Sequence, residues 1–269
     1  MWQGIVMKSL ENFPVIFVGA GPGDPELITV KGRRLIREAD SIVYAGSLVP
    51  ESLLEERKPG AQVHNSAALS LEETHRLLRE GHRSGARVVR LHTGDPSLYG
   101  AIQEQMDLLD RDSIPYEVVP GVSAVFAAAA TLRQELTLPD VSQTLILTRM
   151  AGKTPVPESE SLESLASHRA TLVIYLSVQR IEEVVSRLSS GYLPQTPVVV
   201  AYRVGWPDQE VVRGTLEDIA GRVRSSGIKR QAIIMIGEVF GARDRENKTR
   251  SKLYDETFSH GFRNGSPDS

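Results

Sequence analysis

Three glycine-rich segments of this chain carry residues that could bind a ligand, and the first is GAGPGD at residues 19–24. Such a loop binds phosphate when its backbone N–H groups and a following helix N-terminus point at the anion. Pro22 and Pro25 have no N–H, and Asp24 places a carboxylate where the phosphate charge would lie. The G-x-G-x-G spacing also lacks the later third glycine of the dinucleotide fingerprint. A nicotinamide or flavin site is therefore disfavoured, and either a tight turn capped by Asp24 or a different ligand is expected.

The second and third segments are TGDPSLYG at residues 93–100 and VVPGVSA at 118–124. Asp95 can accept two hydrogen bonds from a ribose diol or one from a charged amine, and Gly94 lets the backbone approach a ligand. The alternative is that Asp95 only caps the helical turn that follows it. Ser123 likewise can cap the next helix or contact a ligand. Because open α/β sheets bind ligands at the carboxyl ends of their strands, we expect the three loops to lie along one rim of a sheet.

The elements that must position these loops follow from apolar periodicity. In the first half, strands alternate with amphipathic helices, a pattern typical of a parallel sheet with helices on both faces. Strands are predicted there at 15–18, 41–44, 62–64, 87–92 and 116–119, with helices at 29–39, 70–84 and 122–130. Ser70-Leu-Glu-Glu73 forms a capping box for the second of these helices. A second α/β set is predicted, with strands at 144–149, 170–176, 197–203, 210–213 and 231–236 and a short helix at 162–167.

The predicted organisation has five parts. These are an N-terminal extension at 1–13, an N-terminal α/β domain at 14–130, a linker at 131–142, a C-terminal α/β domain at 143–240 and a flexible tail at 241–269. The tail carries many charges and few apolar residues, which is why it is excluded from the fold.

Composition narrows the class of protein. A chain of 269 residues with 41% hydrophobic residues can bury a real core. A net charge of −3 and a pI of about 6.1 give no electrostatic case for nucleic-acid binding. The absence of cysteine excludes disulfides, thiolate zinc sites and thiol nucleophiles, and is compatible with a reducing cytosol. No apolar run approaches the ~18 residues of a membrane-spanning helix. We expect a cytoplasmic protein with no membrane partner and no metal site of its own.

The ordered motifs resemble one enzyme family. VGAGPGD at 18–24, TGDPSLYG at 93–100, VVPGVSA at 118–124 and TLVIYL at 171–176 are similar, in order and spacing, to the tetrapyrrole methyltransferases, the S-adenosylmethionine enzymes of cobalamin and sirohaem synthesis. YAGSLV at 44–49, ELTLPDVSQTLILTR at 135–149 and YRVGWPDQ at 202–209 resemble the branch that methylates C11 of precorrin-4 or cobalt-precorrin-4. The uroporphyrinogen-III branch has an Asp-Arg pair after the tyrosine, where this chain has Ala45-Gly46.

The resemblance implies two α/β domains with the cofactor in the cleft between them. It implies cofactor contacts from Pro22, Thr93, Gly94, Asp95, Leu98, Ser123, Ala124, Leu176, Ala201 and Ala232. A carbon of the macrocycle attacks the sulfonium methyl, leaving S-adenosylhomocysteine, so no nucleophilic side chain is required. Asp24, Tyr44 and Glu117 are candidate bases by chemistry alone, and the first two are the catalytic candidates retained.

The implied partner is an anionic tetrapyrrole, with or without cobalt, and a second copy of the chain in a homodimer. Carboxylates favour bidentate arginine, so Arg149, Arg133 and Arg203 are substrate-binding candidates, with solvated surface residues as the alternative. The rival functions are methylation at another tetrapyrrole position, methylation of a modified histidine on a protein, and nicotinamide-dependent oxidation or reduction. The second is disfavoured because the branch-specific segments match the enzymes that act on the ring, and the third because of the first glycine loop.

Overall fold

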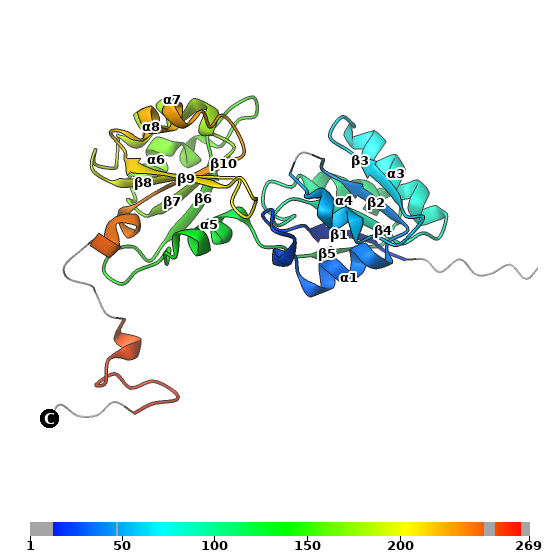
Figure 1. Cartoon of the computed structure of the whole chain (residues 1–269), viewed down its shortest axis with the longest axis horizontal. Helices are drawn as coiled ribbons and strands as arrows, with labels where there is room; N and C mark the ends of the chain where they lie inside the picture. The colour runs from blue at the N-terminus through cyan, green and yellow to red at the C-terminus, as the bar shows by residue number, and fades with distance from the viewer. Residues whose placement is uncertain (1–12, 47, 245–250, 265–269) are drawn as a thin grey trace, which may run out of the picture. The chain divides into compact units, whose positions relative to one another are not determined.

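The computed structural model describes residues 13–46, 48–244 and 251–264. Within these residues the chain forms two compact units. The first extends to residue 127 and also includes 205–207, and the second contains 128–204 and continues from 208. Each unit is built around a five-stranded sheet (Figure 1). The mixed α/β architecture with two sheets agrees with the predicted fold class.

The first sheet has the strand order β3-β2-β4-β1-β5, and every neighbouring pair is parallel. Its strands are β1 (Val15–Gly19), β2 (Ser41–Tyr44), β3 (Gln62–Asn65), β4 (Val88–His92) and β5 (Tyr116–Val119). The helices between them are η1 (Pro25–Leu27), α1 (Val30–Glu38), α2 (Glu51–Glu55), α3 (Leu71–Arg83) and α4 (Ile102–Arg111). The predicted alternation of parallel strands and helices in the first half is confirmed.

Local chemistry explains where these helices begin. Ser70 and Glu73 form the predicted capping box of α3, with the Glu73 N–H donating to Ser70 Oγ at 3.1 Å and the Ser70 N–H donating to Glu73 Oε2 at 2.8 Å. Thr29 caps α1 by accepting the Gly32 N–H at 3.0 Å. Along β1, Val18 belongs to one buried cluster and its neighbour Phe17 to another. Because successive strand residues face opposite sides, both faces of the sheet are covered.

The second sheet has the order β6-β7-β10-β8-β9, and only the β6–β7 pair is parallel among its described pairings. Its strands are β6 (Leu145–Arg149), β7 (Thr171–Tyr175), β8 (Pro197–Tyr202), β9 (Glu210–Thr215) and β10 (Ala232–Ile236). The accompanying helices are η2 (Glu158–Glu160), α6 (Leu162–Ala166), η3 (Val178–Arg180), α7 (Ile181–Leu188) and α8 (Ile219–Ser226). Helix α5 (Ala124–Leu132) contains the passage from the first unit to the second.

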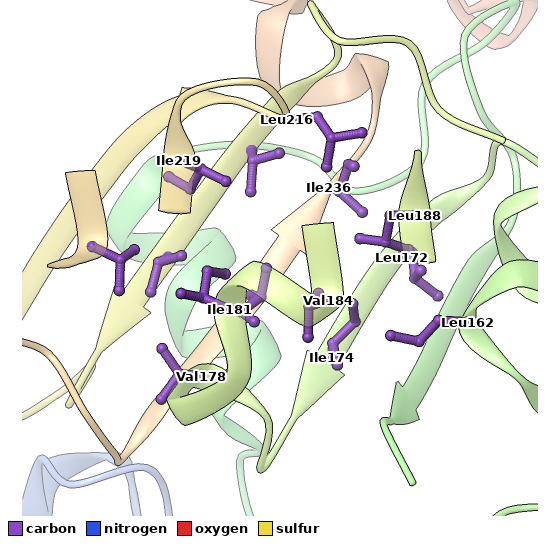
Figure 2. Close-up of a cluster of buried hydrophobic side chains, with 14 of the residues drawn as sticks. Leu162, Leu172, Ile174, Val178, Ile181, Val184, Leu188, Leu216, Ile219 and Ile236 are labelled. Atoms are coloured by element: carbon purple, nitrogen blue, oxygen red, sulfur yellow. The ribbon is translucent and has the colours of Figure 1, made fainter. Parts of the chain in front are cut away.

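One large apolar cluster holds the second unit together. Leu172 and Ile174 of β7 project toward Val184 and Leu188 of α7, as Figure 2 shows. All four side chains are at most 1% exposed. Full burial of an aliphatic side chain stabilises a fold by about 1.5–3 kcal/mol, so this layer fixes the sheet that carries the second-unit candidates.

The structure describes only part of the predicted N-terminal extension and C-terminal tail. The predicted extension at 1–13 lies outside the described residues except for Phe13, and so do 245–250 and 265–269 of the predicted tail. The described part of the tail region includes η4 (Glu238–Asp244) and η5 (Lys252–Tyr254). Val239 and Phe240, which η4 contains, are buried. Among the described helices, none is both long and apolar enough to cross a membrane.

Candidate functional site

Three loops meet at the carboxyl edge of the first sheet. Strand β1 lies between β4 and β5, so the segments that follow these three strands emerge side by side. Gly21 of the first loop and Gly94 of the second form an antiparallel bridge, with N–H···O distances of 3.3 and 2.7 Å. The Ala20 N–H also donates to the carbonyl of His92 at 2.7 Å. The expectation that the glycine loops share one rim of a sheet is confirmed.

Glycine at position 121 allows the third loop to reach the other two. A Cβ on Gly121 would lie 2.1 Å from the Gly94 carbonyl oxygen and 2.8 Å from the Gly19 Cα. Any larger residue would force these backbones apart. By contrast, a Cβ on Gly94 would meet nothing closer than the Ser123 Cα at 3.7 Å. The loops therefore form a closely packed backbone cradle, and Gly94 itself has a φ of 60°, in the left-handed region that favours glycine.

The Asp95 carboxylate connects two of these loops. Its Oδ1 accepts the Ser97 N–H at 2.8 Å, as the capping alternative expects, and its Oδ2 accepts the Gly121 N–H at 2.9 Å. Each carboxylate oxygen has a second lone pair, so these bonds leave capacity for a ligand. Thr93, Gly94, Leu98 and Ala124 are half-buried around Asp95, and Ser123 is buried. The structure thus brings together the cofactor candidates of the second and third loops.

The two catalytic candidates lie at the same edge. Asp24 accepts the Glu26 N–H at 2.8 Å and so caps η1. Tyr44 is the last residue of β2 and pairs in register with Leu91 of β4, one strand from the cradle. Glu117 does not end a strand as Tyr44 does. It lies inside β5, opposite Ile16 of β1, and forms an exposed ion pair with Lys31 at 3.3 Å. The structure places Glu117 away from the loops.

Two buried residues with basic side chains, Arg90 and His92, lie on β4 just before the second loop. Arg90 of β4 donates to Gln105 Oε1 at 2.9 Å and to the carbonyl of Val43 at 3.2 Å, and burial lowers its pKa to about 10. His92 is 4% exposed, and burial together with the Arg90 charge lowers its pKa to about 3. Its Nε2 is buried and has no hydrogen-bond partner among the described residues. His92 is therefore neutral at physiological pH, and its ring centroid lies 6.0 Å from that of Phe17 in the core of the first unit.

The second-unit candidates gather at one edge of the second sheet. Arg149 ends β6 and pairs with Tyr175, so Leu176 follows directly at that edge. Ala232 begins β10 opposite Tyr202, and Ala201 faces Ile233, which brings Arg203 to the same edge. Ala201 and Ala232 are buried, whereas Leu176 is 76% exposed and has a φ of 56°. A left-handed backbone is strained for a leucine, and strain of this kind clusters at ligand and active sites.

Two of the candidate arginines, Arg149 and Arg203, have hydrogen-bond or ion-pair partners within the chain. Arg149 donates to the carbonyls of Thr154 and Pro155 at 3.2 and 2.8 Å, which ties it to the following loop. Arg203 lies 2.9 Å from Asp208 and donates to Gln231 Oε1 at 3.2 Å. Arg133 directly follows α5 and has a φ of 52°, in the left-handed region. The structure places Arg149 and Arg203 at the same edge of the second sheet.

Sequence reasoning missed one residue of the first loop's surroundings. Trp206 belongs to the first compact unit although it follows β8 in the chain, and its Nε1–H donates to the Pro22 carbonyl at 3.0 Å. The motif YRVGWPDQ contained this residue, but a sequence separation of 184 gives no local signal of the contact. Among the described residues, no group of three or more His, Cys, Asp or Glu side chains is arranged to hold a metal ion.

Comparisons with known proteins identify the family. The model of the tetrapyrrole (corrin/porphyrin) methylases matches residues 14–220. The chain is 53% identical over 253 residues to a cobalt-precorrin-4 C(11)-methyltransferase of Methanocaldococcus jannaschii, covering 94% of this chain and 96% of that protein. It is 54% identical over 251 residues to a precorrin-4 C(11)-methyltransferase of Pseudomonas aeruginosa, covering 93% and 99%.

Solved structures agree. The X-ray structure of a cobalt-precorrin-4 methyltransferase of cobalamin biosynthesis matches with a TM-score of 0.84 and 47% identity, covering 88% of this chain and 99% of that one. A uroporphyrin-III C-methyltransferase of Thermus thermophilus, complexed with S-adenosylhomocysteine, matches with a TM-score of 0.71 and 33% identity over 84% and 92%. This chain belongs to the tetrapyrrole (corrin/porphyrin) methylases.

Proposed function

We propose that this protein transfers a methyl group from S-adenosylmethionine to C11 of precorrin-4 or cobalt-precorrin-4 in cobalamin biosynthesis. The observation that carries the proposal is identity above 50%, over more than nine-tenths of the chain, to C(11)-methyltransferases of both substrate forms. The Ala45-Gly46 dipeptide after Tyr44 further separates this chain from the uroporphyrinogen-III branch. Any cobalt enters as part of the substrate.

The three-loop cradle fits the cofactor. Three strand ends bring their backbones together there, and Asp95, which is half-buried, offers a carboxylate to a cation. When bound, S-adenosylmethionine supplies a methyl group already activated on a sulfonium. The residues that would hold it are Pro22, Thr93, Gly94, Asp95, Leu98, Ser123 and Ala124 in the first unit and Leu176, Ala201 and Ala232 in the second.

The chain's own contribution is to orient the reactants and exclude water. Such positioning can lower a barrier by on the order of 7–11 kcal/mol without a nucleophilic side chain. Asp24 and Tyr44 are the groups proposed to accept the proton released from the substrate carbon. Both lie at the carboxyl edge of the first sheet, where the three loops meet. Arg149 and Arg203 are proposed to bind substrate carboxylates. Arg149 would replace or share its bond to the Pro155 carbonyl, and Arg203 its ion pair with Asp208.

The cellular form of the enzyme is also a proposal. We infer a cytoplasmic homodimer, on the strength of the cysteine-free composition and the family resemblance. Light scattering on the purified protein measures the oligomeric state. A molar mass near twice 29.6 kDa is expected, and a mass of one chain would contradict the dimer.

Calorimetry separates the proposed activity from its rival of a different class. We expect S-adenosylhomocysteine to bind with a stoichiometry of one per chain and NADH to give no heat. Pro22, Pro25 and Asp24 are the physical reason, since they remove phosphate donors and add a negative charge at the first loop. Tight NADH binding without S-adenosylhomocysteine binding would overturn the methyltransferase assignment.

A further inference from the structure

Trp206 contacts the first glycine loop, and both lie in the first compact unit. The indole Nε1–H donates to the Pro22 carbonyl at 3.0 Å. Trp206 is half-buried, so this bond is partly shielded from water. Pro22 is buried, and its carbonyl has a specific donor that no residue near it in sequence provides. The direction of the Pro22 peptide therefore depends on a side chain far away in the chain.

Gly23 shows how closely the indole packs against the loop. A Cβ on Gly23 would lie 2.2 Å from Trp206 Cδ1 and 2.3 Å from Nε1, distances that real Cβ atoms do not tolerate. On the other side, a Cβ on Gly205 would lie 3.1 Å from the Asp24 backbone nitrogen. The Gly205-Trp206 dipeptide thus lies directly against the backbone of the loop from Pro22 to Asp24.

The turn that carries Trp206 is itself fixed at its base. Arg203 and Asp208 flank the tip, and Arg203 Nε lies 2.9 Å from Asp208 Oδ1. The Arg203 backbone has a φ of 44°, in the left-handed region, and its N–H donates to the Gln231 carbonyl at 3.0 Å. The ion pair and the Arg203 N–H bond close the base of the turn. The indole itself is held by its bond to the Pro22 carbonyl and by its packing against Gly23.

We propose that Trp206 is a positioning residue for methyl transfer, acting through the first glycine loop. Its N–H fixes the Pro22 carbonyl, and its ring fills the space that Gly23 leaves, so that Pro22 and Asp24 keep the positions proposed for contact with cofactor and substrate. This inference rests on the proposed function, because it assumes that the first loop lines the reacting centre. It assigns the tryptophan of the YRVGWPDQ segment to loop geometry rather than to proton transfer.

Fluorescence provides a readout that a purely structural role would not move. The chain has two tryptophans, Trp2 and Trp206, and Trp2 lies outside the described residues. In a Trp2→Phe variant, Trp206 is the only indole, and its emission should shift or be quenched when S-adenosylhomocysteine is added. The matched control places an indole elsewhere: Leu193→Trp, 57% exposed in the second unit, in a Trp2→Phe, Trp206→Phe background. That emission should stay constant.

Two substitutions test the mechanism of positioning. Trp206→Phe keeps a ring against Gly23 and removes the N–H, so the dissociation constant of S-adenosylhomocysteine should rise roughly three- to tenfold, as for one lost hydrogen bond of ordinary strength. Trp206→Ala should have a larger effect on both this constant and kcat. If Trp206→Ala fails to fold, Trp206→Phe carries the test alone.

Binding of S-adenosylhomocysteine to wild-type protein separates a failure of the positioning role from a failure of the proposed function. Wild-type protein that binds S-adenosylhomocysteine, with a flat Trp206 emission and an unchanged dissociation constant in Trp206→Phe, would overturn the positioning role and leave the methyltransferase intact. Wild-type protein that binds no S-adenosylhomocysteine would overturn both. A Trp206 signal with weakened binding in Trp206→Phe supports the inference.

Discussion

The Oδ2 atom of Asp95 accepts the backbone N–H of Gly121 at 2.9 Å and so joins the second loop of the site to the third. The same carboxylate caps its own turn through the Ser97 N–H. Capping and ligand binding are therefore not exclusive at this position. A carboxylate fixed by two N–H donors is pre-organised, because the entropy of orienting it is lost on folding rather than on binding.

Asp95→Ala should weaken S-adenosylhomocysteine binding roughly tenfold or more, because it removes a charged acceptor and the bond that holds the third loop. Calorimetry measures the change, with circular dichroism to show that the protein remains folded. Asp107→Ala is the control, since Asp107 is an exposed carboxylate on α4 that pairs with Gln103. Unchanged affinity in Asp95→Ala would restrict Asp95 to capping.

Leu172 and Leu176, four residues apart, should separate stability from binding. Leu172 is fully buried in β7, so Leu172→Ala should lower the free energy of unfolding by about 2–5 kcal/mol in urea titrations. Leu176 is 76% exposed, so Leu176→Ala should change stability by no more than about 0.5 kcal/mol.

Affinity for S-adenosylhomocysteine should respond to the two substitutions in the opposite way from stability. We expect Leu176→Ala to weaken S-adenosylhomocysteine binding, because the exposed leucine is proposed to form a wall of its site, and Leu172→Ala to leave the affinity of the folded protein unchanged. An unaffected affinity in Leu176→Ala would remove Leu176 from the proposed cofactor contacts.

His92 should make the protein less stable in mild acid. Burial and the Arg90 charge lower the folded-state pKa of His92 to about 3, below the value of about 6.5 in an unfolded chain. Between these values the unfolded state binds the proton and the folded state does not, so stability is full above pH 6.5 and falls as pH drops toward 3. The slope should reach about 1.4 kcal/mol per pH unit.

Urea titrations between pH 7 and 4 measure this slope. His92→Gln should flatten it, whereas His64→Gln, a change at a half-buried histidine of β3, serves as the comparison. An identical pH dependence in wild type and His92→Gln would show that other groups govern acid stability.

Asp24→Asn tests the proposed proton acceptor while preserving the local structure. The amide oxygen of asparagine can still accept the Glu26 N–H that caps η1, so folding should be unaffected. Loss of the negative charge should lower kcat roughly 10²-fold or more, the scale of general acid–base contributions, with little change in cofactor affinity. Unaltered turnover would exclude Asp24 from the chemistry and leave Tyr44 as the remaining candidate.

Local sequence signals predicted much of this molecule. Apolar runs located every strand of both sheets to within about two residues, and the Ser70 capping box marked the start of α3, because these features depend on residues near one another in the chain. Strand ends also led correctly to the rim where Asp95 and Gly121 meet.

Contacts between distant segments could not be predicted in this way. The antiparallel pairing of β10 with β7 and β8 and the bond from Trp206 to Pro22 join segments separated by many residues, and no periodicity encodes them. The carbonyl contacts of Arg149 were equally invisible, since a side chain that binds a loop and one that binds a substrate have the same sequence signature.

The position of methylation tests the central claim most directly. The enzyme is supplied with precorrin-4 or cobalt-precorrin-4, generated in situ, and with S-adenosylmethionine carrying a ¹³C-labelled methyl group, and the product is analysed by ¹³C NMR. We expect one new labelled methyl group, bonded to C11, together with one S-adenosylhomocysteine per turnover. Label on another ring carbon, or no transfer to either substrate form by a protein that binds S-adenosylhomocysteine, would contradict the account.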